Sequence, residues 1–395
     1  MSRVRTLGHQ PTLDGLRGLA VLLVVFSHAS YGAYPGGFLG VDVFFVLSGF
    51  LISTLLLEEW GRDASISLRA FYRRRVRRLL PALLILMAGG GVLQWAFADL
   101  GASRPYLVGV LGGLFYLNNW VIVWDPHALR TLAPTWSLAV EEQFYLLWPF
   151  LLRMLLRRRI TPRRLLTVVG GVISVTVLYT VVVAWTDPTA NLYESSVPRA
   201  GELALGVALA VLWRERWVPP VLRSRPGATV ALGLLLGLGF TADINASRWL
   251  YTWAGLFLAA GCAGLLLLTC LERLDSLLGR VFRLRFLRYT GRISYGIYLY
   301  NLPLVFLLKP QRLGFEGWPG MAVRLVAIYA VAALSWHLVE SRILRRGRRA
   351  APRSGPVLPV GSGGPARAAG SDPGPGSRSG VGADAAVEAG VQPVR

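Results

Sequence analysis

Charged residues are scarce in this sequence. Asp, Glu, Lys and Arg together make up 16% of its 395 residues, whereas a soluble globular domain carries about 25%. Hydrophobic residues make up 54%, and apolar runs close to the length of one bilayer crossing recur along most of the chain. The shortage of charge therefore excludes an ordinary soluble domain and predicts a polytopic membrane protein. No cleavable signal peptide is expected, because a second apolar run follows the first at once.

Lysine is almost absent, since Lys309 is the only one, so the formal net charge of +21 comes from arginine. The arginines are grouped in short clusters between the apolar runs. That distribution is typical of the positive-inside rule and of attraction to anionic lipid headgroups. We therefore expect the lipid bilayer as a partner and no nucleic acid.

Only two cysteines are present, Cys262 and Cys270, and they stand eight residues apart in one apolar run. On a helix that spacing corresponds to about 12 Å along the axis, which is too far for a disulfide. We expect both to be free, buried thiols. No metal site is predicted.

Eleven apolar segments are candidates for membrane helices, and the arginine clusters between them predict which ones cross. The segments are residues 13–30, 38–57, 80–98, 106–124, 137–156, 165–185, 200–213, 227–241, 249–271, 293–308 and 319–338. Placing every cluster in the cytoplasm gives ten crossings with both termini inside, provided that residues 106–124 do not span. That segment contains Gly112, Gly113, Asn118 and Asn119, so we expect a re-entrant or interfacial element there.

The predicted fold class is all-α, a bundle of about ten transmembrane helices in the plasma membrane. Residues 1–349 are expected to form this membrane domain. The chain changes character at Ala350, beyond which Gly, Pro, Ser, Ala and Val dominate without aromatics. Such a composition cannot bury a core, so residues 350–395 are predicted to be a disordered cytoplasmic tail.

Arg17 and His28 lie within the first apolar run, LDGLRGLAVLLVVFSHA. Their spacing of eleven residues places them on one stripe of a helix, about 16 Å apart along its axis, with Arg17 toward the cytoplasm. Taken singly, Arg17 is explained as a snorkelling anchor near Asp14 and His28 as an interfacial residue. Ionisable groups inside a membrane usually mark a functional path, and the shared stripe favours that interpretation.

Acidic residues are expected at a similar depth, near the outer ends of later segments. They are Asp42, the adjacent pair Glu141 and Glu142, and Glu202 with Arg199 just before it. The adjacent pair also suits a helix N-terminus, but helical neighbours point about 100° apart, so one of the two can face the interior alone. A histidine beside a carboxylate is a general-base arrangement. The predicted catalytic candidates are therefore His28, Asp42, Glu141 and Glu142, with the carboxylate that pairs with His28 left open.

The stretch FYRRRVRRLLP holds five arginines within six positions. Cytoplasmic retention explains some of them, but arginine also binds phosphate in a bidentate manner. A phosphate site at the cytoplasmic mouth and a deep histidine–carboxylate site fit a donor with an anionic head and a reactive far end, such as an acyl-coenzyme A. Direct attack of an acceptor hydroxyl on the thioester is expected, because no Gly-x-Ser-x-Gly nucleophile elbow is apparent.

Several motifs together resemble the acyltransferase-3 family, membrane O-acyltransferases that modify bacterial surface polysaccharides and some macrolides. The first run matches the family's Arg-x10-His signature at Arg17 and His28, and RRVRRLLPA matches its R-x-x-R element at Arg75 and Arg78. TWSLAVEEQFYLLWP matches the segment around the family's glutamate, here Glu141. Further helices match at FLGVDVFFVLSGFLIS, RAGELALG, GRISYGIYLYNLP and SWHLVES, so the similarity spans about residues 12–345.

The resemblance implies ten helices and an acyl-CoA donor. It also implies roles in donor binding and catalysis for Arg17 and His28, and donor contacts from the R-x-x-R pair on the cytoplasmic side. The predicted donor-binding residues are accordingly Arg17, Arg75 and Arg78, with Arg74 beside them.

Two departures from the family pattern matter. Asn301 stands where the family often has histidine, so no proton transfer is predicted there. Many relatives append an extracytoplasmic hydrolase-like domain, whereas the tail expected here is disordered. The predicted acceptor is therefore a glycan, a glycolipid or a macrolide.

Two other functions remain open from the sequence. Intramembrane charges also line the path of a transporter or flippase, but the paired broken helices of an inverted repeat are not apparent. A catalytically inactive membrane scaffold or sensor is the third possibility.

Overall fold

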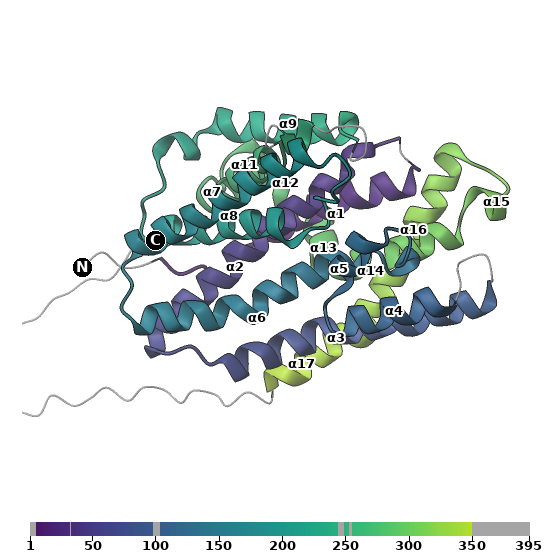
Figure 1. Cartoon of the computed structure of the whole chain (residues 1–395), viewed down its shortest axis with the longest axis horizontal. Helices are drawn as coiled ribbons and strands as arrows, with labels where there is room; N and C mark the ends of the chain where they lie inside the picture. The colour runs from purple at the N-terminus through teal and green to yellow at the C-terminus, as the bar shows by residue number, and fades with distance from the viewer. Residues whose placement is uncertain (1–4, 32, 98–102, 244–248, 253–254, 350–395) are drawn as a thin grey trace, which may run out of the picture. The chain divides into compact units, whose positions relative to one another are not determined.

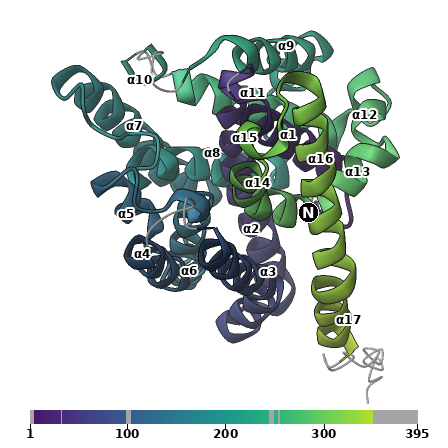
Figure 2. The same ribbon diagram turned by 90° about the vertical axis from the view of Figure 1, so that its right-hand side faces the viewer.

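The computed structural model describes residues 5–31, 33–97, 103–243, 249–252 and 255–349. These residues form a bundle of α-helices, and no strand occurs among them. Figure 1 shows the long helices running in broadly similar directions, and in the turned view of Figure 2 several of them, α3 and α6 among them, are seen nearly end-on. The all-α prediction is confirmed.

The helices of the first half of the chain are α1 (Pro11–Ala29), α2 (Leu39–Asp63), α3 (Leu68–Ala96), α4 (Ser103–Leu114), α5 (Asn118–Trp124), α6 (Thr135–Arg157), α7 (Pro162–Thr186) and α8 (Ser196–Arg214). Those of the second half are α9 (Arg225–Thr241), α10 (Trp249–Thr252), α11 (Gly255–Glu272), α12 (Leu277–Phe282), α13 (Arg285–Arg292), α14 (Ser294–Leu307), α15 (Pro310–Leu313), α16 (Gly317–Ser335) and α17 (Ser341–Arg349). A π-helical turn, Trp336–Glu340, joins α16 to α17.

Seven helical segments in the described part of the chain are long and apolar enough to cross a membrane. They lie at Pro11–Ala29, Pro35–Asp63, Leu68–Ala96, Pro162–Thr186, Ser196–Arg214, Gly255–Glu272 and Gly317–Arg346. On α7, large apolar side chains such as Val175 and Leu178 are exposed, which is the surface expected of a helix that faces lipid. The chain is thus a multi-pass membrane protein.

The predicted number of ten crossings stays a prediction. All ten segments assigned to it contain a helix, but α9 and α14 have only 17 and 14 residues. In α6, the adjacent Glu141 and Glu142 lower the hydropathy of an otherwise apolar helix. The predicted tail, residues 350–395, lies outside the described residues, and the predicted domain boundary at residue 349 stays a prediction.

The segment at residues 106–124 is interrupted, as its glycines and asparagines predicted. It forms α4 and α5 with a break between them, where Tyr116 takes a left-handed φ of 56°. The Asn118 side chain closes the break by donating from Nδ2 to the Gly109 carbonyl, 2.8 Å away, and to Thr135 Oγ1, 2.6 Å away. These bonds tie the start of α5 back to α4 and to the start of α6.

Helices α3 and α6, on either side of this segment, run in opposite directions. Tyr72, near the start of α3, donates to the Leu146 carbonyl in the second half of α6. Further along α3, Leu83 and Met87 belong to one apolar cluster with Leu132, which precedes α6. Helices α4 and α5 therefore begin and end toward the same end of the bundle, which fits a re-entrant element.

Helix α2 lies at the centre of the bundle, and its close approach to α8 depends on glycine. A Cβ atom at Gly49 would collide with the Leu203 carbonyl, and one at Gly206 would collide with the Val46 carbonyl. Small residues that let two helix backbones meet in this way are typical of membrane interfaces. The two cysteines are free and buried in α11, as expected.

Helices α1 and α14 run side by side in the same direction. His28 of α1 contacts Asn301 of α14, and one turn later the Tyr31 hydroxyl donates to the Val305 carbonyl, 2.9 Å away. This parallel pair carries polar residues along its length, and it provides the axis along which the candidate site is arranged.

Candidate active site

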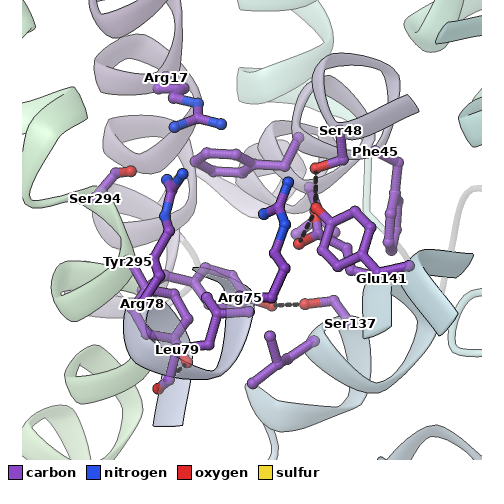
Figure 3. A pocket seen from close by; sticks show the side chains of 15 residues that line it. Arg17, Phe45, Ser48, Arg75, Arg78, Leu79, Ser137, Glu141, Ser294 and Tyr295 are labelled. Carbon is purple, nitrogen blue, oxygen red and sulfur yellow. Dashed lines mark hydrogen bonds between the residues drawn. The ribbon is translucent and has the colours of Figure 1, made fainter. Parts of the chain in front are cut away.

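A pocket lies between α1, α2, α3, α6 and α14 (Figure 3). The space between its side chains, including the opening, amounts to about 670 Å³. Its lining combines aromatic and aliphatic side chains with three arginines and one glutamate, and the full set is Arg17, Val41, Phe44, Phe45, Ser48, Arg75, Arg78, Leu79, Ser137, Leu138, Glu141, Tyr145, Ser294, Tyr295 and Tyr298. Apolar walls with a few converging polar groups are typical of a small-molecule site.

Arg75 and Arg78 reach the pocket from the same face of α3. They stand three residues apart, which places them side by side on a helix, and Figure 3 shows both side chains pointing toward Arg17 of α1. The guanidinium of Arg75 lies over the Tyr145 ring, with Cζ 4.3 Å from the ring centroid. A cation stacked on an aromatic face keeps its N–H groups free in the ring plane to bind an anion.

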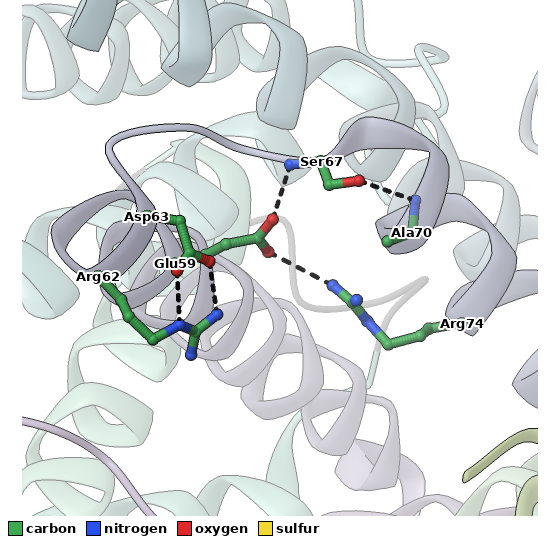
Figure 4. A network of polar contacts seen from close by, with 6 residues as sticks. All are labelled: Glu59, Arg62, Asp63, Ser67, Ala70 and Arg74. Atoms are coloured by element: carbon green, nitrogen blue, oxygen red, sulfur yellow. Dashed lines mark hydrogen bonds and ion pairs between the residues drawn. The ribbon is translucent and has the colours of Figure 1, made fainter. Parts of the chain in front are cut away.

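Arg74 does not line this pocket, although it was predicted with the other two. One residue before Arg75, it points away from that face, and its side chain is 61% exposed. Its Nη2 lies 3.5 Å from Glu59 Oε2, in a surface network that also holds the ion pair of Arg62 with Asp63 (Figure 4). Helical spacing separates neighbours by about 100°, so a run of arginines cannot all serve one site.

The three arginines of the pocket carry unbalanced charge. Among the described residues, no carboxylate lies within ion-pair distance of Arg17, Arg75 or Arg78. Like charges that converge in a partly desolvated space repel one another. The arrangement is therefore suited to a polyanionic ligand.

Glu141 is the acidic residue of the pocket, and two hydroxyl groups hold it. Ser48 Oγ donates to Glu141 Oε1 across 2.7 Å, and the Tyr145 hydroxyl lies 3.2 Å from Oε2. Ser48 and Tyr145 also contact each other, 2.8 Å apart. The three side chains therefore contact one another in a closed triangle, of which Figure 3 labels Ser48 and Glu141. Because the Tyr145 ring lies against the Arg75 guanidinium, these contacts help to position that arginine.

Glu142 faces a different direction from Glu141, as adjacent helical residues must. It does not line the pocket. Its Oε1 atom is buried without a hydrogen-bond partner among the described residues. The structure thus places Glu141 in the pocket and Glu142 outside its lining.

Asp42 lies in a separate, fully buried ion cluster. Its Oδ1 lies 2.6 Å from Arg199 Nη1, and the same nitrogen lies 2.5 Å from Glu202 Oε1. Arg199 also donates to the Tyr193 carbonyl, and its guanidinium lies over the Tyr193 ring. The sequence predicted a shared depth for these groups, but they meet one another and not His28. The geometry gives Asp42 a structural contact.

His28 pairs with an amide, where the sequence analysis expected a carboxylate. Its Nδ1 lies 2.5 Å from Asn301 Oδ1, and Asn301 Nδ2 donates to the Tyr298 carbonyl, also across 2.5 Å. Because the amide nitrogen donates to that carbonyl, the amide oxygen faces the ring and accepts a hydrogen bond from the Nδ1–H group. Nε2 is then left unprotonated, with a lone pair available to a substrate.

Several polar residues of the site were not predicted from the sequence. Ser48 and Tyr145 hold Glu141, and Ser137 Oγ lies 2.7 Å from the Tyr298 hydroxyl inside the pocket. On α6 a signal was present, because Ser137 and Tyr145 stand four residues before and after Glu141 and so share its face. On α14, Asn301 was singled out by position but given no role.

Pocket and histidine follow one another along the parallel pair α1 and α14. Arg17 on α1 and Ser294, Tyr295 and Tyr298 on α14 belong to the pocket. One to three turns further along, His28 meets Asn301. The cationic pocket and the histidine therefore lie one after the other along the same two helices.

These features define a class: a helical, multi-pass membrane protein with a cationic pocket inside the bundle and an oriented histidine beyond it. A family model described as an acyltransferase domain matches residues 10–339, which is most of the chain. The chain belongs to this family, the acyltransferase-3 family.

Relatives with similar sequences agree with the assignment. The chain is 33% identical over 359 residues to the peptidoglycan O-acetyltransferase OatA of Listeria monocytogenes, covering 85% of this chain and 56% of the relative. It is 34% identical over 367 residues to the putative peptidoglycan O-acetyltransferase YrhL of Bacillus subtilis, covering 87% and 56%. The O-acetyltransferase OatA of Staphylococcus aureus is 29% identical over 365 residues, with 86% and 58% covered.

The chain thus spans little more than half the length of these relatives. No solved structure matches the chain.

Proposed function

We propose that this protein is an integral-membrane O-acyltransferase that uses acyl-CoA as the donor and a glycan hydroxyl as the acceptor. Membership of the family supports the reaction class. The observation that carries the proposal is the order of groups along α1 and α14, with three arginines around one pocket and His28 beyond them. A donor with an anionic head and a distant reactive group matches that order.

The donor's phosphates would occupy the cationic pocket. Coenzyme A carries several negative charges, and Arg17, Arg75 and Arg78 present guanidinium groups from two helices. Each guanidinium can bind phosphate oxygens in a bidentate manner. Glu141 acts here as a positioning residue, since it anchors Tyr145, on which Arg75 rests.

His28 would act as the general base. Its Nδ1–H is held by Asn301 Oδ1, so Nε2 accepts the proton of the acceptor hydroxyl as the oxygen attacks the thioester carbonyl. The new C–O ester bond forms, the C–S bond breaks, and the coenzyme A thiolate leaves. The proton returns from His28 to that thiolate, so the free thiol is released and the imidazole is neutral again.

The acceptor assignment rests on the relatives, two of which are named for peptidoglycan. We therefore propose a glycan of the cell envelope ahead of a macrolide or glycolipid. A flippase has less support, because the family match is to an acyltransferase domain.

The test uses the full chain purified in lipid nanodiscs, with acetyl-CoA labelled in its acetyl group and soluble glycan fragments as acceptors. The wild type should form a labelled, base-labile ester on the glycan. His28→Ala should lower the transfer rate by about 100-fold or more, the usual contribution of a general base, while acetyl-CoA binding persists. Uptake of label without ester formation would indicate a transporter, and neither binding nor transfer would indicate an inactive scaffold.

A further inference from the structure

A second pocket lies at the other end of α1, away from the arginine pocket. The end of α1, the segment around α15 and the start of α16 line it, and the space, including its opening, amounts to about 990 Å³. Its lining residues that matter here are Tyr31, Tyr34, Glu316, Trp318 and Arg324. None of them belongs to the site described above.

Arg324 is the unusual residue of this pocket. Only 2% of it is exposed, although it stands two turns into the apolar helix α16. Nη1 donates to the Leu308 carbonyl across 3.2 Å, whereas Nε is buried without a partner in the described part of the chain. No carboxylate of the described residues lies within ion-pair distance of it.

A buried, unpaired arginine is expensive to maintain. Its charge loses hydration without gaining a counter-charge, and within a membrane protein such a residue usually marks a functional site. The guanidinium also lies over the Tyr31 ring, with Cζ 4.5 Å from the centroid. Tyr31 has a left-handed φ of 51°, a conformation that is unfavourable for a residue with a side chain. The local structure therefore maintains a buried cation that has no ion-paired carboxylate among the described residues.

The walls of the pocket suit a sugar ring. Tyr34 and Trp318 offer flat apolar faces, and Trp318 is 71% exposed at the rim. Aromatic side chains with a polar edge combine contact area with hydrogen bonding, and Gln311 and Glu316 add polar groups. A saccharide has C–H groups on its ring faces and hydroxyls around its edge, so it can use both kinds of surface.

The pocket is also close to the proposed base. Tyr31 follows His28 by three residues, just beyond the end of α1, and its hydroxyl donates to the carbonyl of Val305, one turn beyond Asn301 on α14. A ligand resting against Tyr31 would thus lie about one helical turn from His28 along the axis. The opposite direction along α1 leads to the arginine pocket.

We propose that this second pocket binds the acceptor, and that Arg324 recognises an anionic group on it, so that the acceptor is an acidic sugar. This inference rests on the proposed function, since it assigns the acceptor of that reaction. Either of two anionic groups on a sugar, a carboxylate or a phosphate, fits this site.

The test measures direct binding of three probes to the full chain in nanodiscs by saturation-transfer NMR. N-acetylmuramic acid differs from N-acetylglucosamine by one carboxylate-bearing ether on O3, and N-acetylglucosamine 1-phosphate differs from it by a phosphate on C1. We expect an anionic probe to bind at least tenfold more tightly than N-acetylglucosamine. The preferred anionic probe identifies whether carboxylate or phosphate is the source of the charge.

Arg324→Gln should remove this preference, and Arg324→Lys, which keeps a charge, should retain part of it. Arg62→Gln serves as the matched control. Arg62 is an exposed arginine that pairs with its neighbour Asp63 and is distant in sequence from Arg324, so this variant should bind the probes like the wild type. Trp318→Ala at the exposed rim should weaken all three probes without affecting folding. Acetyl-CoA binding to each variant confirms that it is folded.

Equal binding of neutral and anionic probes to the wild type would overturn the proposal, as would an unchanged preference in folded Arg324→Gln. Failure of the proposed function looks different. In that case acetyl-CoA yields no ester on any acceptor, whatever the sugar probes show.

Discussion

At the scale of single residues, the arginines of α3 provide the sharpest test of the donor site. Arg75→Ala and Arg78→Ala should each raise the KM for acetyl-CoA by about tenfold, because a lost guanidinium–phosphate contact is worth about 1.4 kcal/mol. Steady-state kinetics in nanodiscs measure the change.

Arg74→Ala is the matched control, since Arg74 belongs to the same helix and the same run of arginines but lies beside Glu59 on the surface. Exposed ion pairs contribute little, so its KM should stay near the wild-type value. An equal effect of all three substitutions would mean that the cluster acts only through overall charge.

Asn301 is predicted to position His28. Asn301→Leu removes the oxygen that accepts from Nδ1 and should lower kcat by about tenfold or more, comparable to the loss of an outer partner that orients a metal-bound histidine. The KM for acetyl-CoA should not change, because the arginine pocket is intact. Kinetics with both substrates separate the two parameters.

Asn301→Asp keeps an acceptor oxygen and should retain far more activity than the leucine variant. A merely structural role would give both variants the same loss of folded protein and leave kcat per folded molecule untouched. That outcome would remove Asn301 from the mechanism.

Single residues also show the limit of the sequence. Arg75 and Arg78 were predictable from a helical spacing of three, whereas Arg74 was included because the motif gives no direction for a side chain. Asp42 shares a depth with the site but meets Arg199, which comes from α8. Which side chains pair across two helices depends on how the helices are rotated and packed against each other, and a local sequence pattern does not determine this.

At the scale of elements, the interrupted segment of α4 and α5 is the feature best predicted from composition. Cysteines introduced at Phe97 and His127, which flank the segment, should react with a membrane-impermeant maleimide from the same side. The prediction follows from the opposite directions of α3 and α6. Labelling is measured in sealed vesicles of known orientation.

A cysteine at Arg159, on the turn between α6 and α7, should react from the other side only. The background carries Ala at Cys262 and Cys270, both buried and free. Labelling of Phe97→Cys and His127→Cys from opposite sides would show that the segment crosses the membrane. The assigned inside and outside would then have to be exchanged for all helices that precede the segment or for all that follow it.

At the scale of the whole molecule, the cluster of Asp42, Arg199 and Glu202 ties α2 to α8 at the centre of the bundle. Arg199→Met should strongly destabilise the protein, by about 3–5 kcal/mol, because it leaves two buried carboxylates without a counter-charge. Thermal unfolding in nanodiscs, followed by tryptophan fluorescence, measures the loss.

Asp42→Asn should be milder, since the pair of Arg199 with Glu202 survives. The folded fraction of this variant should retain acyl transfer. Loss of transfer at unchanged stability would instead restore Asp42 as a member of the catalytic group.

The fold class and the interrupted segment could be predicted because both follow from local patterns in the sequence, namely the apolar runs, the arginine clusters and the glycines and asparagines within one run. The site could be predicted only in part. His28 and Glu141 lie on different helices, and the structure gives each a separate partner, Asn301 and Ser48. Which groups meet is decided by the parallel packing of α1 with α14, a long-range feature that no single segment encodes.

That parallel packing has a consequence for traffic across the membrane. The two pockets lie toward opposite ends of α1. In the proposed reaction, donor and acceptor would therefore approach His28 from opposite directions, and neither would follow the other through the bundle. Only the acyl group would be transferred near His28, and coenzyme A would leave by the way it entered. Such a transfer would need no movement of either larger molecule across the bilayer.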